Sequence, residues 1–387
     1  MVTRSPIHQQ VDTLPGIVES MIDDLVRQAG AALPPALCRE INQVYLTGCG
    51  DSHHAAVNAE MAFGQLAGLP CRAAPALAFG RYIAPTLQTA EGKALLLAVS
   101  ASGQVSRAVE ALQLGRLAGA VPAAVTGSAK SPLAAAGEIV LHTAVPPLPD
   151  ELAGLIVPGA RSYVASQLML YVVAIHLGQA RGHLRKKQSN ELRRELAGMA
   201  ESMEATIILC DPLAQRAAEA WQEAAAFVYC GAGPSYGTAL FSAAKLLEAS
   251  GDTAVAQELE EWAHLEYFAR EAGTPTILIS GGGRDADRLL EVAAAAAAIG
   301  RSTAVIAPLD SDAANKAQSD YLFPLAGTPR ECFSPLSACL PGLLFAAYRA
   351  QAINEPYFRA FGGGRSPEGG GGISRIRTSH QISELPD

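Results

Sequence analysis

The stretch VYLTGCGDSHHAA, residues 44–56, has a second copy in the chain, FVYCGAGPSYGTA, residues 227–239. In both copies an apolar, strand-like run leads into a Gly-x-Gly turn, and a helical pattern follows. A repeat of this kind sets the architecture, because each copy is one supersecondary unit. The pair therefore predicts an internal duplication in which both halves contain the same strand, turn and helix.

Two further pairs extend the duplication. LLLAVSASGQVSR, residues 95–107, is similar to the stretch TILISGGGRDADR, residues 276–288, when Ser100 is aligned with Ser280, and residues 120–143 correspond to residues 302–325. Short runs of Val, Ile and Leu alternate with segments of helical length, which is the pattern of βαβ units on a parallel sheet. The sequence therefore predicts an α/β fold of two tandem, doubly wound parallel-sheet domains. Such sheets bind ligands at the carboxyl ends of their strands.

Composition divides the chain into five expected parts. These are a helical N-terminal segment at 1–30, a first sheet domain at 31–180, a charged helical connector at 181–205, a second sheet domain at 206–355 and a tail at 356–387. Seven glycines lie between 362 and 372, and such a stretch holds no regular structure by itself. We expect the tail to be either a disordered end or a lid that orders over a ligand.

The overall composition narrows the class of protein. The 387 residues are 49% hydrophobic and 17% charged, a globular balance that suits two domains. A net charge of -8 argues against nucleic-acid binding, whereas a small anionic ligand needs only local donors. The N-terminus has no apolar signal core, and no apolar run approaches the ~20 residues of a membrane span. We therefore expect a cytoplasmic protein without a membrane segment.

The turn after the strand-like run at 95–99 carries hydroxyls, whereas its counterpart in the second half carries acids. The first copy has Ser100, Ser102, Gly103 and Ser106, and the second has Ser280, Gly282 and Ala286 in register, with Asp285 and Asp287 added. Phosphate binds well where hydroxyl donors meet backbone N–H groups at a helix N-terminus, and two carboxylates would repel it. We therefore predict a phosphate site in the first copy, to which Ser52 adds a hydroxyl. Simple helix capping by these serines is the alternative.

A candidate proton-transfer pair lies in TALFSAAKLLEASGD, residues 238–252. Lys245 and Glu248 are three residues apart, so they share one helix face, and their neighbours are Ala, Leu and Phe. An acid and a base in apolar surroundings can have the shifted pKa values that proton transfer needs. The alternative is an ordinary ion pair on a solvated face.

Two other motifs point to cofactors but are incomplete. His53 and His54 have no third ligand at a useful spacing for a metal ion. GCGDSH, residues 48–53, lacks the third glycine of a dinucleotide-binding fingerprint. We therefore expect neither a metal nor an organic cofactor.

Taken together, these residues resemble the sugar isomerase (SIS) domain family, over about residues 10–378. The likeness is to the tandem-domain isomerase half of glucosamine-6-phosphate synthase and to stand-alone phosphosugar isomerases, aminosugar-phosphate deaminases and fructosamine-phosphate deglycases. GCGDSHH, residues 48–54, is similar to the family's GCGTSY turn. The resemblance would place Ser52 on the family's phosphate-site serine and Asp51 on its threonine.

The hydroxyl-rich turn also resembles a family motif. SASGQVS, residues 100–106, looks like the loop S-Q-S-G-E-T, in which Ser100, Ser102 and Gly103 match. Val105 falls where the family has its phosphate-binding threonine. The resemblance leaves Ser106, one position further on, as the candidate substitute.

The remaining motifs concern catalysis. KLLE, residues 245–248, resembles K-L-K-E, which would make Lys245 and Glu248 the catalytic pair. His264 falls on the family's ring-opening histidine, although its context is EEWAHLE instead of E-L-K-H-G-P. GISRIRTS, residues 372–379, is similar to the tail that closes the site, with Arg375 where the synthase has lysine.

The resemblance implies an activity and a partner. It implies a phosphosugar isomerase or aminosugar-6-phosphate deaminase that opens the sugar ring and moves a proton between C1 and C2. It also implies a homodimer in which His264 reaches the neighbouring subunit's site. The short N-terminus leads us to expect no glutaminase domain. The alternatives are a fructosamine-6-phosphate deglycase and a non-catalytic sugar-phosphate-binding regulator.

Overall fold

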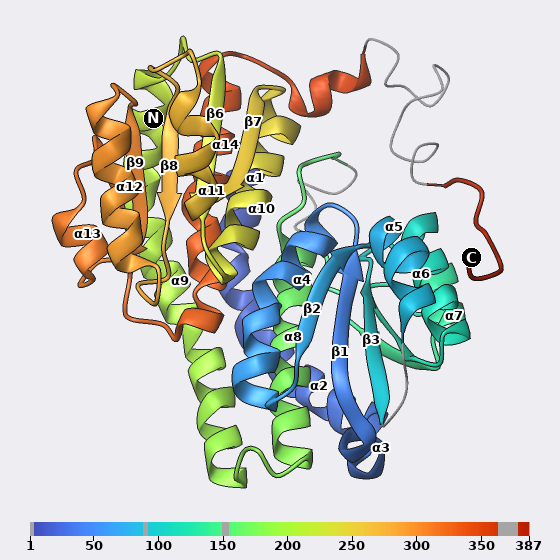
Figure 1. Ribbon diagram of the computed structural model, residues 1–387. Coiled ribbons are helices and arrows are strands. Elements are labelled where there is room, and N and C mark those ends of the chain that lie inside the picture. Colours follow the sequence, from blue (N-terminus) through green and yellow to red (C-terminus); the bar gives the residue numbers. More distant parts are fainter. Residues whose placement is uncertain (1–3, 88–91, 149–154, 363–377, 387) are drawn as a thin grey trace. The chain divides into compact units, whose positions relative to one another are not determined.

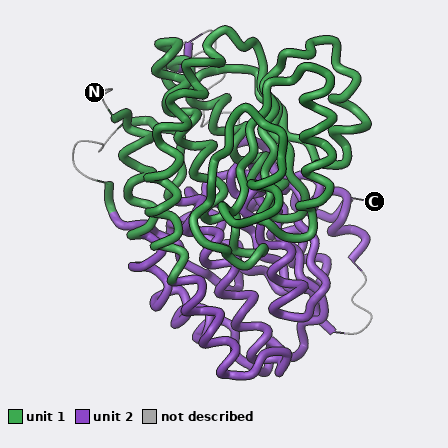
Figure 2. The backbone as a smooth tube through the Cα atoms, turned by 90° about the vertical axis from the view of Figure 1, so that its left-hand side faces the viewer, with its two compact units in different colours: residues 1–16, 147–161, 198–360 green, residues 17–146, 162–197, 361–387 purple. Residues whose placement is uncertain are grey.

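The computed structural model describes residues 4–87, 92–148, 155–362 and 378–386. The chain forms two compact units, each with its own parallel sheet (Figure 2). Unit 1 consists of Met1–Gly16, Pro147–Arg161 and Gly198–Ala360, and unit 2 consists of Ile17–Pro146, Ser162–Ala197 and Phe361–Asp387.

Unit 2 contains a five-stranded sheet with the strand order β2-β1-β3-β4-β5. Figure 1 labels the first three of these strands, in this order. All neighbouring strands of this sheet are parallel. The strands are β1 (Ile41–Gly48), β2 (Cys71–Pro75), β3 (Lys93–Val99), β4 (Val121–Thr126) and β5 (Ile139–His142). Helices of this part of the chain are α2 (Leu14–Ala32), α3 (Pro35–Glu40), α4 (Asp51–Ala62), α5 (Ala76–Ala78), α6 (Ser106–Leu117), α7 (Pro132–Ala136) and α8 (Arg161–Ala180).

Unit 1 contains a second five-stranded parallel sheet with the order β10-β9-β8-β6-β7. Its strands are β6 (Ala226–Gly231), β7 (Thr253–Glu258), β8 (Thr276–Ile279), β9 (Thr303–Pro308) and β10 (Tyr321–Leu325). The helices are α1 (Pro6–Asp12), α10 (Pro234–Ser250), α11 (Leu259–His264), α12 (Ala286–Ala298), α13 (Asp312–Lys316) and α14 (Pro335–Ala352), and α9 (Lys186–Ala220) runs through both units. The two sheets have equivalent strand orders, and the predicted α/β fold of two parallel-sheet domains is confirmed.

The burial of the strands follows from their residues. Apart from Lys93, β3 is buried throughout, and all six residues of β9 are buried, as expected for interior parallel strands covered on both faces. By contrast, β7 lies at the edge of its sheet and is only partly buried. The interior strands therefore read as continuous apolar runs, and their polar residues appear only where the strands end.

One helix corrects an expectation from the sequence. Within the described residues, α8 is the one helix long and apolar enough to cross a membrane by length and composition. Its sequence therefore contradicts the expectation that no apolar run approaches such a length. However, 83% of its apolar window is buried inside the structure, as in the core helix of a globular domain.

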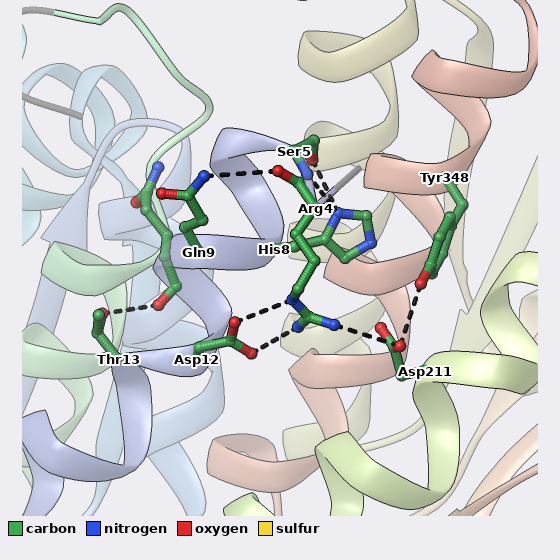
Figure 3. Close-up of polar contacts among 9 residues, drawn as sticks. Arg4, Ser5, His8, Gln9, Asp12, Thr13, Asp211 and Tyr348 are labelled. Carbon is green, nitrogen blue, oxygen red and sulfur yellow. Dashed lines mark hydrogen bonds and ion pairs between the residues drawn. The ribbon is translucent and has the colours of Figure 1, made fainter. Parts of the chain in front are cut away.

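A polar network holds α1 inside unit 1 (Figure 3). The guanidinium of Arg4 pairs with Asp12 at 2.6 Å and with Asp211 of α9 at 3.3 Å. The Tyr348 hydroxyl donates to the same Asp211 carboxylate at 3.1 Å, and the His8 ring packs edge-on against Tyr348. Burial lowers the pKa of His8 to about 4, so this ring is neutral at pH 7.

Candidate functional site

Two turns of unit 2 meet at the carboxyl edge of its sheet. β1 and β3 are hydrogen-bonded neighbours, and Thr47 is paired with Ala98 near the ends of the two strands. The Gly-x-Gly turn leaves β1 directly after this pair, and residues 100–106, which we call the hydroxyl turn, leave β3. The register therefore brings the predicted phosphate-binding segments to one edge, where parallel sheets present their ligands.

The hydroxyl turn is shaped by its own serines. The N–H of Gly103 donates to the Ser100 hydroxyl at 3.2 Å, and the N–H of Gln104 donates to the Ser102 hydroxyl at 3.3 Å. The residue that caps α6 is Val105, which makes no side-chain capping bond, so the helix-cap alternative is wrong for these two serines. Ser100 and Ser106 are buried, whereas Ser102 is exposed. The turn thus leaves the Ser102 hydroxyl exposed just before the N-terminus of α6.

The Gly-x-Gly turn starts α4 in a similar way. Gly50 caps the helix with a φ of 55°, and Asp51 and Ser52 occupy the first turn of α4, each partly buried. A Cβ at Gly48 would lie 2.8 Å from the Cβ of Ser52, so only glycine lets the strand end this close to the helix. The Asp51 carboxylate approaches His54 Nδ1 at 3.8 Å.

Sequence reasoning missed a third hydroxyl-bearing loop at the same edge. Residues 127–131 follow β4, and the N–H of Gly127 donates to the carbonyl of Ala101 at 3.0 Å. A Cβ at Gly103, whose φ is 64°, would lie 2.1 Å from Ser131 Oγ. The signal was available, because TGSAKS follows a buried strand just as the hydroxyl turn does.

Lys245 and Glu248 form a contact on α10 in unit 1. Lys245 Nζ lies 2.5 Å from Glu248 Oε2 and 5.3 Å from the centroid of the Phe241 ring. The lysine side chain is 0% exposed and the glutamate side chain 23% exposed. The alternative of a pair on a solvated face is therefore wrong for Lys245, because its side chain does not reach solvent. A lysine is almost never fully buried without a partner, and Glu248 is in contact with it. The arrangement leaves the carboxylate as the accessible member.

His264 has a different setting in unit 1. It ends α11, its side chain is 67% exposed, and its Nε2 lies 3.3 Å from Glu260 Oε1. Arg288 donates two hydrogen bonds to the same carboxylate, at 2.6 and 3.0 Å. The structure therefore pairs His264 with an acid that a cation already holds in place.

Residues 280–287, the acidic turn, are the counterpart of the hydroxyl turn in unit 1. The Ser280 hydroxyl donates to Asp285 Oδ1 at 2.6 Å, and the N–H of Arg284 donates to Glu331 Oε1 at 3.2 Å. A Cβ at Gly283 would lie 2.1 Å from Glu331 Cδ, so the missing side chain makes room for that carboxylate. Burial, with added repulsion from Glu331 and Asp287, raises the pKa of Asp285 to about 6.

Two further points of the sequence analysis concern Arg375 and a metal ion. Arg375 lies outside the residues that the structure describes. Within residues 4–87, 92–148, 155–362 and 378–386, no group of three His, Cys, Asp or Glu side chains is arranged to hold a metal ion. His53 and His54 are neighbours on α4, and burial lowers the pKa of His53.

Comparison with known proteins assigns the part of the chain that contains the first sheet to a protein family. Residues 38–177 match the family model of the SIS domain. These residues are a SIS domain. The glutamine–fructose-6-phosphate aminotransferase (isomerizing) of Streptomyces coelicolor is 28% identical over 324 residues, which are 83% of this chain and 51% of that protein. The chain thus spans about half the length of this curated relative.

Solved structures extend the fold assignment to the whole chain. The C-terminal domain of glucosamine-fructose-6-phosphate aminotransferase from Francisella tularensis superimposes with a TM-score of 0.77 at 16% identity, covering 91% of this chain and 97% of that one. Glucosamine-6-phosphate deaminase from Thermotoga maritima gives 0.62 at 15% identity, covering 98% of each chain. The predicted resemblance to the SIS family is confirmed for residues 38–177, and the solved structures show the same fold for the second sheet.

Proposed function

We propose that this protein is a phosphosugar isomerase or an aminosugar-6-phosphate deaminase that acts on a hexose or hexosamine 6-phosphate. The observation that carries the proposal is the fully buried Lys245 held against the more accessible Glu248 in an SIS-type fold. A buried ammonium that fixes one carboxylate supplies the charged pair that general acid–base chemistry requires. The hydroxyl turn supplies the complementary feature, a site for the phosphate that fixes the substrate's register.

The proposed reaction moves protons and needs no external oxidant. His264 assists ring opening by transferring a proton between the ring oxygen and the anomeric hydroxyl. The Glu248 carboxylate then takes a proton from one of the carbons C1 and C2 and returns it to the other, through an enediol, while a second proton moves between the oxygens on these two carbons. Lys245 stabilises the negative charge that develops on the sugar oxygens during this step. In the deaminase version, ring opening and proton transfer from C2 to C1 leave an imine at C2, and water adds to this carbon, which releases ammonia and leaves the C2 ketone.

The phosphate contacts are assigned to residues of unit 2. Ser52, Ser100, Ser102 and Ser106 supply hydroxyls, Gly103 allows the close turn, and Asp51 lies beside the sugar. Arg375, proposed from the resemblance, covers the ligand. We further propose a cytoplasmic homodimer in which His264 acts in the neighbouring subunit's site, and the 67% exposure of its side chain supports this.

The alternatives differ in the chemistry after binding. A fructosamine-6-phosphate deglycase cleaves a C–N bond with similar groups, so product analysis separates it from an isomerase. A sugar-phosphate-binding regulator needs only the phosphate site. The burial of Lys245 against Glu248 disfavours a regulator, because a fully buried lysine is retained at a cost that phosphate binding alone does not require.

The decisive experiment is Glu248→Gln, assayed with fructose 6-phosphate and glucosamine 6-phosphate for isomerisation and ammonia release. We expect binding to persist while kcat falls about 10²–10⁴-fold, because the amide cannot take the proton. Glu291→Gln, on the exposed face of α12, is the matched control and should keep wild-type kcat. Wild-type protein that binds these sugars with no turnover would contradict the enzyme proposal and favour the regulator.

A second measurement tests the phosphate assignment. A ligand at a hundred times its Kd raises stability by about 2.7 kcal/mol, so a thermal-shift screen detects it easily. We expect hexose 6-phosphates to raise Tm, the unphosphorylated sugars to leave it unchanged, and Ser102→Ala to reduce the shift to about half. A Ser102→Ala protein that responds like wild type would show that the phosphate binds elsewhere.

A further inference from the structure

The last described residues of the chain, 378–386, lie against α6 in unit 2 (Figure 1). We call them the C-terminal segment. The N–H of Ser379 donates to the Ser106 hydroxyl at 2.8 Å, and the N–H of Ile382 donates to Glu110 Oε2 at 2.8 Å. The side chains of Ile382 and Leu385 pack against the core cluster that α6 shares with β3. The segment is thus fixed by two backbone donors and two apolar side chains.

Glu110 is the centre of this attachment. Its carboxylate is 1% exposed and accepts hydrogen bonds from Arg81 at 2.8 Å and Arg107 at 2.6 Å, besides the Ile382 N–H. Burial alone would raise the pKa of Glu110, but the Arg81 and Ile382 hydrogen bonds and the charges of both arginines lower it overall. A buried carboxylate with this many donors is ionised and rigidly placed.

Arg107 ties the segment to the start of α6. Its guanidinium donates to the Ser379 hydroxyl at 3.3 Å and to the carbonyl of His380, while it also pairs with Glu110. In the second half of the chain the position corresponding to Glu110 is Leu290. The carboxylate therefore belongs only to the half with the hydroxyl turn.

We propose that Glu110 is a positioning residue for phosphate binding, because it anchors the C-terminal segment so that the Ser379 N–H orients the Ser106 hydroxyl. A serine hydroxyl has one hydrogen and two acceptor lone pairs. When the Ser379 N–H occupies a lone pair, the hydroxyl hydrogen turns toward another acceptor, and at the N-terminus of α6 that acceptor is a phosphate oxygen. The inference rests on the proposed function, since it assumes phosphate at the hydroxyl turn.

This arrangement couples the segment to the ligand. If docking of the segment favours phosphate binding, phosphate binding must favour docking by the same factor. The amides of Ser379 and Ile382 should therefore exchange their hydrogens more slowly when a sugar phosphate is bound. Val105 has no hydroxyl, and Ser106 is the serine of the hydroxyl turn that the segment contacts.

The test combines amide exchange with affinity for fructose 6-phosphate in the full chain. In wild type, the Ser379 and Ile382 amides should exchange at least about tenfold more slowly than the amide of exposed Ser383, and more slowly still with ligand. Ser379→Pro removes the donor to Ser106 and leaves Glu110 intact, and Ser383→Pro is the matched control. We expect Kd to rise about tenfold in Ser379→Pro and in Glu110→Gln, with Ser383→Pro like wild type.

A double variant shows whether Glu110 affects phosphate affinity through the C-terminal segment. If Glu110 acts through the segment, Glu110→Gln/Ser379→Pro binds no more weakly than either single variant. Multiplied losses, or a Ser379→Pro protein with wild-type or tighter affinity, would overturn the inference and leave the phosphate turn standing. Wild-type protein that binds neither fructose 6-phosphate nor inorganic phosphate would overturn the phosphate assignment and the inference together.

Discussion

The hydroxyl turn and the acidic turn are built on the same backbone plan. Ser100 and Ser280 each donate their N–H to the neighbouring strand, at 3.0 and 2.9 Å. Each turn also contains a glycine with a positive φ, 64° at Gly103 and 75° at Gly282. The two turns differ in the source of the anion that their N–H groups bind, which in the hydroxyl turn is the proposed phosphate. In the acidic turn it comes from the chain itself, since Glu331 accepts the Arg284 N–H.

This difference explains the loss of hydroxyls in the second half. A turn that receives an internal carboxylate needs no serine donors for a phosphate, and a second anion would meet both Glu331 and Asp285. The hydroxyl turn has no carboxylate in its own seven residues, and its exposed Ser102 faces solvent. One scaffold therefore serves an external anion in one half, as we propose, and encloses its own anion in the other.

The largest contrast should come from adding a methyl group to each turn. Gly103→Ala places a Cβ 2.1 Å from Ser131 Oγ and 2.3 Å from Ser131 Cβ, at a φ of 64° that alanine avoids. We expect a loss of about 4 kcal/mol, from the strained backbone and the overpacking together. Urea unfolding of the variant and wild type measures this loss.

Gly283→Ala is the matched variant in the acidic turn. Its Cβ meets the carboxylate end of Glu331, which is the far end of a flexible side chain and can move aside. We expect a loss of about 1 kcal/mol. Equal losses in the two variants would contradict the view that the hydroxyl turn has a strained glycine against a close neighbour and the acidic turn an unstrained glycine against a movable one.

The acidic turn should also respond to pH. The pKa of Asp285 is raised from 3.8 to about 6, first by burial. Its contribution to stability is therefore full below pH 4 and is lost as pH rises through 6, when a charge forms in a buried place. Asp285→Asn removes this titration, so its stability relative to wild type should increase by about 2.5 kcal/mol between pH 4 and pH 8.

Urea unfolding at both pH values provides the measurement. Asp287→Asn is the control, because Asp287 is exposed in the same turn, and its relative stability should change by less than about 0.5 kcal/mol. A pH-independent difference between Asp285→Asn and wild type would show that the carboxylate is solvated, and the enclosed-anion interpretation would then be wrong.

The sequence predicted those parts of the structure that depend on local pattern. Buried runs such as β3 and β9 identify interior parallel strands, and the glycines of the turns mark where those strands end. Lys245 and Glu248 were found because an i,i+3 spacing on a helix fixes their proximity. Full burial of Lys245 was not predictable, since it depends on how α10 packs within unit 1.

Contacts between distant positions were not predictable from one sequence. Glu331 enters the acidic turn from 47 positions away, and Ile382 reaches Glu110 from 272 positions away. The sequence around Glu331 and around Glu110 contains no pattern that predicts which residue each carboxylate binds. The sequence of α6 even suggests that Glu110 is exposed, because a charged residue in a helix is usually solvated. Such pairings follow from the fold, so only the structure shows them.

A last substitution makes the hydroxyl turn resemble its twin. Ser102→Asp places a carboxylate at the exposed position of the turn, where it repels a phosphate and competes for the N–H groups of α6. We expect fructose 6-phosphate to bind about 100-fold more weakly, which corresponds to about 2.7 kcal/mol. Ser102→Asn has nearly the same shape without the charge, and calorimetric titration should show it losing only about tenfold, the contribution of one hydroxyl. If both variants lose affinity equally, the lost hydroxyl and not the added charge decides binding, and the acids of the second turn would then not explain why it differs from the first.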